Sequence, residues 1–373
     1  RDRYIIVTKQ HSAKNVIYEE LQDQQNREEY HIDNMKKYSD NLDEEPKQYV
    51  IKYTHKITNR ECLVIIGTID SFNYNLGDSH GGGSNIFASI LNNIIKDGSS
   101  KMSSNGCIRY AGESIYINKG TEIWIDEVQD LNTSYLYSMV RLMKDTYCDI
   151  NIVGDKLQSL QYKVNFLTTV MNGEGLPDIK IEGRDKKENN NRRINVNGLH
   201  NKINEIINFD KYGLPEIEIA EENINKLKDY ETPMDIILSP EIYSNTEEAK
   251  VSAYVDIIID KVRYEVDKYK YKPNNFMFIF PIMKNNLVAT ELETKLNEFW
   301  SDKFRVEKEY KQYAFLHKHE SGCAIDTTKS INSSRIMSIQ TSKGDGREVV
   351  FVLGTTEKSL KLVSDNELNL LYE

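Results

Sequence analysis

The sequence predicts an α/β protein built on largely parallel sheets. Short apolar runs alternate along the chain with longer segments in which apolar residues recur every three or four positions. This alternation of buried strands and amphipathic helices is typical of βαβ units. A length of 373 residues corresponds to two domains. No run approaches the roughly 20 apolar residues of a membrane span, and no signal-peptide pattern occurs, so we expect an intracellular protein of the cytoplasm or nucleus that binds no membrane.

The predicted elements follow in chain order. Apolar runs predict buried strands at residues 4–7, 63–66, 122–125, 149–153, 276–280 and 348–353. A helix is predicted to begin at Ser244, where Glu247 completes a capping box. Its apolar face comprises Val251, Val255, Ile258, Ile259 and Val262. A second helix over 284–300 has an apolar face of Leu287, Val288, Leu292, Leu296 and Phe299. We interpret both faces as core.

Charge and polar runs indicate how the chain is divided. The net charge of −10 argues against a globally basic nucleic-acid-binding surface, although a local channel remains compatible with it. Residues 17–45 are strongly acidic, and we expect them to form a solvated excursion. The polar run at 183–191 predicts a boundary near 185, giving domains 1–185 and 186–373, with inserts in the first at about 17–60 and 81–120. The four scattered cysteines form no C-x-x-C pair, so we expect reduced thiols and no zinc site.

The strongest local signal is the segment 123–130, in which an apolar strand ends at Asp126 and Glu127. In a parallel sheet, the carboxyl ends of strands face the ligand crevice. A carboxylate there can hold Mg²⁺ through water, and its neighbour can orient or deprotonate an attacking water. The alternative is that acids are merely enriched where a helix begins, because they interact favourably with the helix dipole. Locally, the two interpretations have equal weight.

Two further segments carry weaker signals. At 152–159, Gly154 permits a tight turn and Gln158 could reach a phosphate, although a simple turn capped by Asp155 explains the pattern better by itself. At 338–351, a glycine-rich basic turn precedes a strand and could present backbone N–H groups and Lys343 to phosphates. A plain β-turn is the alternative there.

Taken in order, these segments resemble the motifs of superfamily 1 helicases, closest to the UvrD/Rep/PcrA branch. Residues 125–130 resemble the Walker B motif (DExQD), and 153–159 resemble motif III (GDxxQS). Weaker matches to motifs Ia, Ib, IV and V occur at 8–14, 68–72, 191–193 and 338–351. The Gly-Asp-Gly variant of motif V and the Asn- and Ile-rich composition further resemble helicases of large DNA viruses.

The resemblance implies two RecA-like domains of the P-loop NTPase type, with ATP and Mg²⁺ bound between them. Asp126 would hold Mg²⁺ through water, and Glu127 would activate the hydrolytic water. Gln158 would sense the γ-phosphate and couple it to DNA, and Arg193 would stabilise charge on the transferring phosphoryl group. By the same resemblance the motor would move 3′ to 5′ on single-stranded DNA and act on duplex DNA.

The resemblance also implies a groove for single-stranded DNA, which tracks phosphates and stacks bases. The residues that would line it are Thr8, Thr68, Ser71, Phe72 and Lys343. Motif III normally continues with a stacking aromatic residue, but Gln161 occupies that position, so the adjacent Tyr162 is the candidate substitute. In motif V, Gly346 aligns with a glutamate of the family, and we assign that role to no residue.

No G-x-x-x-x-G-K-[ST] loop occurs in these residues, and neither does motif VI. We therefore expect an internal segment of a longer helicase that hydrolyses ATP inefficiently by itself. A non-hydrolysing nucleic-acid-binding protein with a degenerate helicase fold is the main alternative. The motor of a helicase–nuclease, with a nuclease as further partner, is another. An RNA helicase or a viral nucleoside triphosphatase stays open as well, because discrimination of the 2′-OH cannot be read from the sequence.

Overall fold

The computed structural model divides the chain into two compact units, Arg1–Gly175 with Asn245–Glu373, and Leu176–Ser244. The predicted boundary at residue 185 lies outside the residues that the structure describes. Those described are 2–9, 11–23, 30–38, 46–77, 84–100, 107–159, 164–173, 190–191, 194–229, 248–283, 285–303, 314–316, 333–342, 346–356 and 359.

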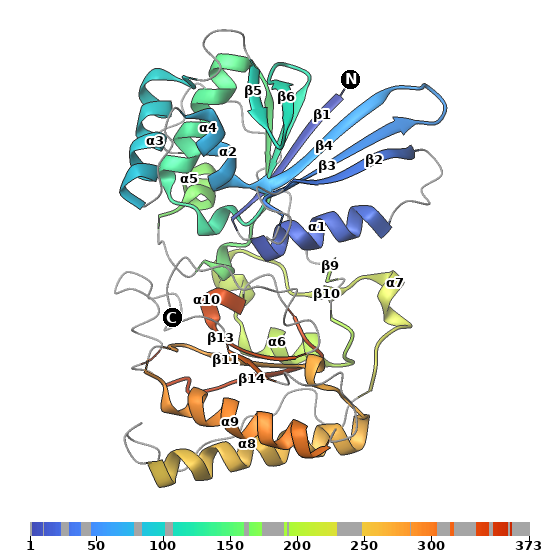
Figure 1. The fold of residues 1–373 in the computed structure, drawn as a ribbon, viewed down its shortest axis with the longest axis vertical. Coiled ribbons are helices and arrows are strands. Elements are labelled where there is room, and N and C mark those ends of the chain that lie inside the picture. The colour runs from blue at the N-terminus through green and yellow to red at the C-terminus, as the bar shows by residue number, and fades with distance from the viewer. Residues whose placement is uncertain are drawn as a thin grey trace. The chain divides into compact units, whose positions relative to one another are not determined.

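The amino-terminal half of the first unit contains a six-stranded, mostly parallel sheet with the order β2-β3-β4-β1-β7-β8. Figure 1 shows the strands β2, β3, β4 and β1 of this sheet. Four strands pair in parallel: β1 (Asp2–Thr8), β4 (Glu61–Thr68), β7 (Thr121–Ile125) and β8 (Asp149–Ile152). They confirm the α/β class and the four strands predicted in this half. Because β8 is an edge strand of this sheet, its residues are only partly buried, whereas the sequence predicted a buried strand.

The two faces of this sheet are covered by different helices. Alternate apolar residues of β1, β4 and β7 point to one face, where Ile5 pairs with Ile65 and Ile123 and all three are buried. Helices on that side of the sheet are α2 (Ile69–Leu76), α3 (Ser84–Asp97) and α4 (Thr133–Thr146) (Figure 1). On the opposite face lies α1 (His11–Asp23), where Tyr18 stacks on Tyr49 of β3 with ring centroids 3.9 Å apart.

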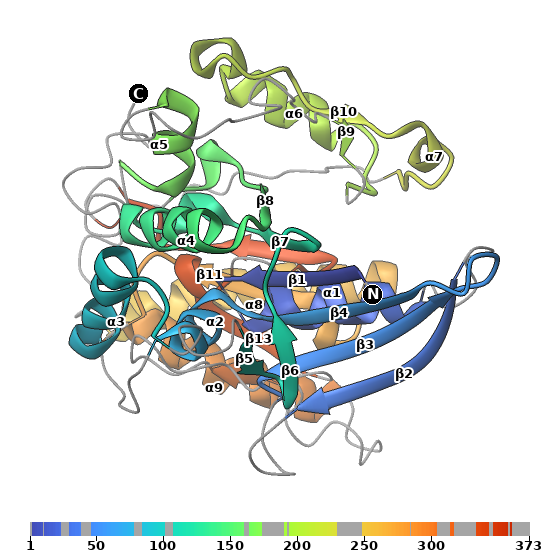
Figure 2. The ribbon, with the colours of Figure 1, turned by 90° about the horizontal axis from the view of Figure 1, so that it is seen from above.

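The acidic insert contributes structure that the sequence did not predict. Residues 17–23 of the acidic stretch belong to α1, and residues 30–38 form β2 (Tyr30–Tyr38). Strand β2 pairs antiparallel with β3 (Gln48–His55) and so extends the sheet beyond β4 (Figure 2). Ile32 and Met35 of β2 pack against the apolar cluster beneath α1. Residues 30–38 are therefore an edge strand rather than an excursion from the fold, although His31, Asp33, Asn34, Lys36 and Lys37 are exposed to solvent as expected. The second insert contains α3 and the hairpin of β5 (Cys107–Tyr110) and β6 (Glu113–Tyr116).

The carboxyl-terminal half of the first unit contains a four-stranded parallel sheet with the order β12-β13-β11-β14. Its strands are β11 (Phe276–Phe280), β12 (Ala314–Leu316), β13 (Ser334–Ser338) and β14 (Val349–Val352). Two long helices, α8 (Glu248–Tyr269) and α9 (Leu287–Lys303), pack with these strands in one core. The predicted start of the first helix at Ser244 lies outside the described residues. Short α10 (Ile339–Ser342) follows β13.

The predicted apolar faces of these helices are confirmed, with one exception. All five predicted residues of α8 are buried. In α9, Val288, Leu292 and Leu296 are buried, and Phe299 is partly buried against the same core. Leu287 is 43% exposed because it is the first residue of the helix. Strand β14 is also less buried than predicted, since it lies at the sheet edge and exposes Val350 and Val352.

The second unit is small and contains mostly short elements. Strands β9 (Asn190–Asn191) and β10 (Glu218–Ile219) pair in parallel, and the helices are α6 (Leu199–Ile206) and α7 (Glu221–Ile224). In the first unit, α5 (Phe166–Asn172) follows β8. No helix among the described residues has the length and apolar character needed to cross a bilayer.

Candidate functional site

The motif-bearing turns of the first half lie at one edge of its sheet. Strands β1, β4, β7 and β8 are parallel neighbours, so their carboxyl ends meet there. Lys9 follows β1, Thr68 ends β4, Asp126 follows β7, and Gly154 lies two residues after β8. Ligands of open α/β sheets bind outside the carboxyl ends of the strands. This edge is therefore the candidate site.

The two acidic residues after β7 lie in a tightly held turn. The backbone N–H of Asp126 donates to the carbonyl of Val7 on β1 (2.9 Å), and Asp126 Oδ1 accepts from the N–H of Glu127 (2.9 Å). Glu127 has left-handed backbone angles, φ 58° and ψ 39°. Non-glycine residues are rarely found in this conformation, which costs of the order of 1–2 kcal/mol. Both carboxylates are half-buried, so the turn presents charge at the sheet edge.

Gln158 lies in the corresponding turn after β8. It ends a single 3₁₀ turn over Lys156–Gln158, and its side chain is exposed. Its Nε2 donates to Asp155 Oδ2 (3.0 Å), while Asp155 Oδ1 caps the turn by accepting from the N–H of Leu157 (2.9 Å). The predicted capping role of Asp155 is therefore confirmed, and the same carboxylate also holds the Gln158 amide.

The turns after β7 and β8 are joined by a residue for which sequence reasoning gave no role. Gln129 is fully buried, and its side-chain amide donates to Glu127 Oε2 and accepts from the backbone N–H of Asp155 (3.1 Å). The predicted catalytic carboxylate and the turn that carries Gln158 are thereby connected. The available signal was the glutamine in the motif-like segment 125–130, between two acidic residues.

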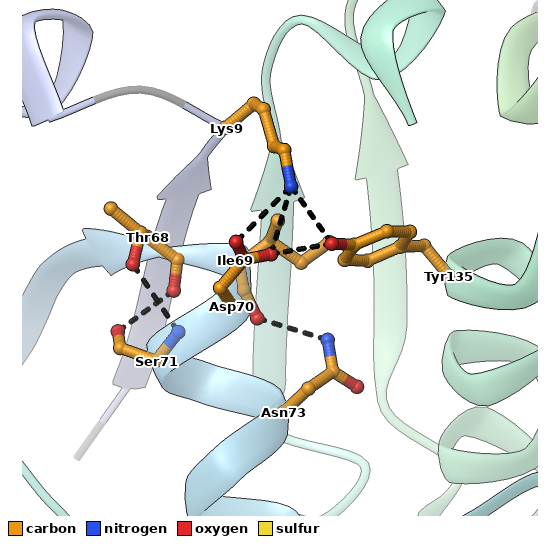
Figure 3. Close-up of polar contacts among 7 residues, drawn as sticks. All are labelled: Lys9, Thr68, Ile69, Asp70, Ser71, Asn73 and Tyr135. Carbon is orange, nitrogen blue, oxygen red and sulfur yellow. Dashed lines mark hydrogen bonds and ion pairs between the residues drawn. The ribbon is translucent and has the colours of Figure 1, made fainter. Parts of the chain in front are cut away.

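Three charged or polar side chains form a second cluster at the same edge (Figure 3). Lys9 Nζ donates to both carboxylate oxygens of Asp70 (3.1 Å each) and to the hydroxyl of Tyr135 (2.8 Å). The Tyr135 hydroxyl donates to Asp70 Oδ1 (2.6 Å), and Lys9 Nζ lies 4.9 Å from the centre of the Tyr135 ring. The cluster joins the end of β1 to the starts of α2 and α4. Sequence analysis gave none of these three residues a role in the site, although Lys9 and Asp70 lie in the segments that resemble motifs Ia and Ib, because they are 61 to 126 positions apart.

The residues predicted to bind DNA in the first half have different degrees of access. Thr68 caps α2: its Oγ1 accepts from the N–H of Ser71 (3.2 Å), and Ser71 Oγ donates to the Thr68 carbonyl (2.8 Å), as Figure 3 shows. Ser71 is half-buried. Thr68 itself is buried, as are Thr8 and Phe72, and Phe72 packs against the Tyr110 ring. The side chains of these three residues pack into the core, and their predicted contact with DNA stays a prediction.

Burial affects the ionisation of the tyrosine beside Ser71. The Tyr110 hydroxyl lies 3.0 Å from Ser71 Oγ, and burial raises the pKa of Tyr110 far above its usual range, against the smaller opposing effect of this hydrogen bond. Gly67 makes room for this hydroxyl, since a Cβ at residue 67 would lie 2.0 Å from it. The neutral Tyr110 hydroxyl therefore holds Ser71 in place.

Three predicted site residues lie outside the described part of the chain. They are Tyr162, Arg193 and Lys343. Their roles stay predictions. Within the described ranges, no group of three or more His, Cys, Asp or Glu side chains could hold a metal ion.

Comparisons with known proteins add no relative to this chain. No family model, no curated protein and no solved structure matches it.

Proposed function

We propose that this chain is the motor part of an ATP-dependent DNA helicase or translocase of the superfamily 1 type, built on two RecA-like domains. One observation supports this most strongly. Two segments that resemble the Walker B motif and motif III lie at the carboxyl ends of adjacent parallel strands, and Gln129 joins them through a buried amide. A carboxylate that can hold Mg²⁺ and a nearby glutamine or acidic residue that can orient water are parts that recur in enzymes of phosphoryl transfer.

The residues present fit a magnesium ion held jointly with a nucleotide. Mg²⁺ prefers oxygen ligands and is commonly bound by one or two carboxylates together with substrate phosphates and water. Asp126 supplies a half-buried carboxylate at the sheet edge, next to the carboxylate of Glu127. When bound, the ion neutralises charge on the phosphate oxygens.

The chain's own residues then divide the work of hydrolysis. Glu127 accepts a proton from the water whose oxygen attacks the γ-phosphorus, and the bond from phosphorus to the bridging oxygen of ADP breaks. Gln158 contacts the γ-phosphate from the neighbouring turn. Arg193 stabilises the negative charge that spreads over the transferring group. The products are ADP, inorganic phosphate and the proton taken up by Glu127.

Single-stranded DNA would be bound by residues of both halves of the chain. Half-buried Ser71 at the start of α2 remains a candidate for a phosphate contact, as do Tyr162 for stacking and Lys343 for a phosphate. The buried side chains of Thr8, Thr68 and Phe72 are left out of this proposal. We keep the 3′-to-5′ direction of movement as part of the proposal, on the resemblance alone.

The proposal is tested by phosphate release from ATP, measured on the protein expressed from its full natural reading frame with and without single-stranded DNA. We expect Mg²⁺-dependent hydrolysis that single-stranded DNA stimulates at least about tenfold, because a motor couples DNA binding to closure of its nucleotide site. DNA binding without hydrolysis at any ATP concentration would contradict the motor and favour the degenerate binding protein. Equal stimulation by RNA would contradict the restriction to DNA.

A further inference from the structure

Gln129 makes side-chain and backbone contacts with three parts of the candidate site. Its amide nitrogen donates to Glu127 Oε2, and its amide oxygen accepts from the backbone N–H of Asp155 (3.1 Å). Its backbone carbonyl accepts from Ser159 Oγ (3.1 Å). The whole side chain is buried, with 0% exposure. A buried amide fixes the positions of its partners when its nitrogen and its oxygen are both hydrogen-bonded. Breaking either hydrogen bond would leave a buried polar group without a partner, which costs free energy.

The chemistry of the two partners specifies glutamine at this position. A backbone N–H can only donate, so the amide oxygen must face Asp155 and the amide nitrogen must face Glu127. An ionised carboxylate can only accept, and it receives the N–H that the amide nitrogen offers. Glutamate would oppose one carboxylate with another, methionine would bond to neither partner, and asparagine is one methylene shorter. Of these side chains, only that of glutamine offers a donor and an acceptor at this reach.

Gly154 provides an independent observation of the same contact. A Cβ at residue 154 would lie 2.7 Å from Gln129 Oε1 and 2.9 Å from a methyl carbon of Val128. The glycine therefore lets the turn after β8 approach closely enough for the N–H of Asp155 to reach the amide. A backbone hydrogen bond joins the same two turns, with the N–H of Val128 donating to the carbonyl of Val153 (3.2 Å).

The contact extends to the next helix. Ser159 Oγ accepts from Asn165 Nδ2 (3.2 Å), and both residues are buried. Asn165 caps α5 by accepting from the N–H of Thr168 (2.9 Å). A displacement of the turn that bears Gln158 would therefore be resisted by α5 on one side and transmitted to Glu127 through Gln129 on the other.

We propose that Gln129 is a positioning residue: it holds the Glu127 carboxylate in the orientation needed to accept a proton from water, and it makes that orientation depend on the position of the turn that carries Gln158. This inference rests on the proposed ATP hydrolysis. It goes further because it assigns a role to a buried residue that need not touch the nucleotide. It also names the contacts, through Asp155 and Gln129, that connect the turn bearing Gln158 with Glu127.

Kinetics of the full-length protein test the role of Gln129. We expect Gln129→Met to lower kcat for ATP at least about tenfold and to change KM less than about threefold, because it disturbs the base and not nucleotide binding. In a Glu127→Gln background the same substitution should lower the residual rate less than about twofold, since the base it positions is already gone. Gln129→Asn should reproduce the loss seen with methionine. Gln48→Met, at a buried glutamine on β3, is the matched control and should leave kcat unchanged.

Equal losses of kcat in the wild-type and Glu127→Gln backgrounds would overturn the positioning role. A rise in KM with kcat unchanged would do the same, because it would place Gln129 in nucleotide binding. A wild-type protein that hydrolyses no ATP would refute the proposed function. The contacts of the Gln129 amide with Glu127 and Asp155 would then be tested by thermal unfolding alone.

The thermal experiment uses Gly154→Ala, alone and combined with Gln129→Ala. The added methyl group meets the Gln129 amide oxygen first, so truncating Gln129 should relieve part of the strain. We expect Gly154→Ala to lower the Tm in both backgrounds. The decrease in the Gln129→Ala background should be smaller than the decrease in the wild type by at least about 2 °C. Equal decreases of the Tm in the two backgrounds would show that residue 154 and the Gln129 side chain do not meet. That result would overturn the contact of the Gln129 amide with the turn after β8.

Discussion

Replacing Glu127 with glutamine is expected to lower ATP turnover by at least about a hundredfold while ATP still binds. Removing a general base typically costs two to four orders of magnitude. The substitution keeps the length and hydrogen-bonding capacity of the side chain but removes its ability to take up a proton. It also leaves the left-handed backbone at residue 127 occupied by a side chain of similar size. The measurement is steady-state phosphate release with single-stranded DNA, beside equilibrium binding of a non-hydrolysable ATP analogue.

The matched control is Glu122→Gln on the same strand. Glu122 lies near the other end of β7, where it accepts a hydrogen bond from Trp124 Nε1 (3.2 Å), and a glutamine oxygen can still accept that bond. Its turnover should match that of the wild type. If Glu127→Gln also hydrolyses ATP at the wild-type rate, Glu127 is not the base.

Replacing Trp300 with alanine is expected to reduce the free energy of unfolding by about 3–5 kcal/mol. Trp300 is fully buried in the core of the carboxyl-terminal half, with its ring 5.6 Å from that of Phe276 and 4.8 Å from that of Phe299. Its indole N–H donates to Ser334 Oγ (3.2 Å), and that hydroxyl donates to the carbonyl of Pro273 (2.8 Å). Truncation would leave a large cavity and remove a buried hydrogen bond. Urea unfolding followed by circular dichroism measures the loss.

The second tryptophan of the chain provides the comparison. Trp124 on β7 is 40% exposed, so its truncation removes less buried surface and leaves no closed cavity. Trp124→Ala should reduce the free energy of unfolding by less than about 1.5 kcal/mol. Similar losses for the two variants would contradict the placement of Trp300 at the centre of this core.

The strands that the sequence predicted best are those buried on both faces. Runs such as residues 63–66 are apolar throughout because β4 lies between β1 and β3 in the middle of the sheet. Strands β2 and β3 escaped prediction because charged residues such as Lys36, Lys37 and Lys52 interrupt their apolar positions. Edge position also explains why β8 and β14 are more exposed than expected, since pairing order depends on the whole fold and not on the local sequence.

The position of two acidic residues at the end of a strand could be predicted from the local sequence, whereas contacts between distant residues could not. Asp126 and Glu127 could be found because a strand ended in two acids. The cluster of Lys9, Asp70 and Tyr135 could not, since its members meet only when β1, β4 and α4 come together. Likewise, the motif-like position of Phe72 did not reveal that its ring packs inward on Tyr110.

The left-handed backbone conformation of Glu127 also depends on contacts with its neighbours. A left-handed non-glycine residue persists only where its surroundings fix it. Here the N–H bond to Asp126 and the side-chain bond from Gln129 do so. A residue with no role in chemistry could be replaced at this position by glycine or asparagine, which adopt the conformation more readily. A glutamate held in this conformation keeps its carboxylate at the sheet edge, where Gln129 contacts it.

The most direct test of the central claim is equilibrium binding of a fluorescent ATP analogue to the full-length protein, with Mg²⁺ and with EDTA. If the carboxylate after β7 holds the metal of a bound nucleotide, Asp126→Asn should weaken binding in Mg²⁺ at least about tenfold and leave binding in EDTA nearly unchanged. Asp149→Asn, at the exposed start of the neighbouring strand β8, should match the wild type under both conditions. Equal affinity of Asp126→Asn and wild type in Mg²⁺ would contradict a nucleotide site at this edge of the sheet.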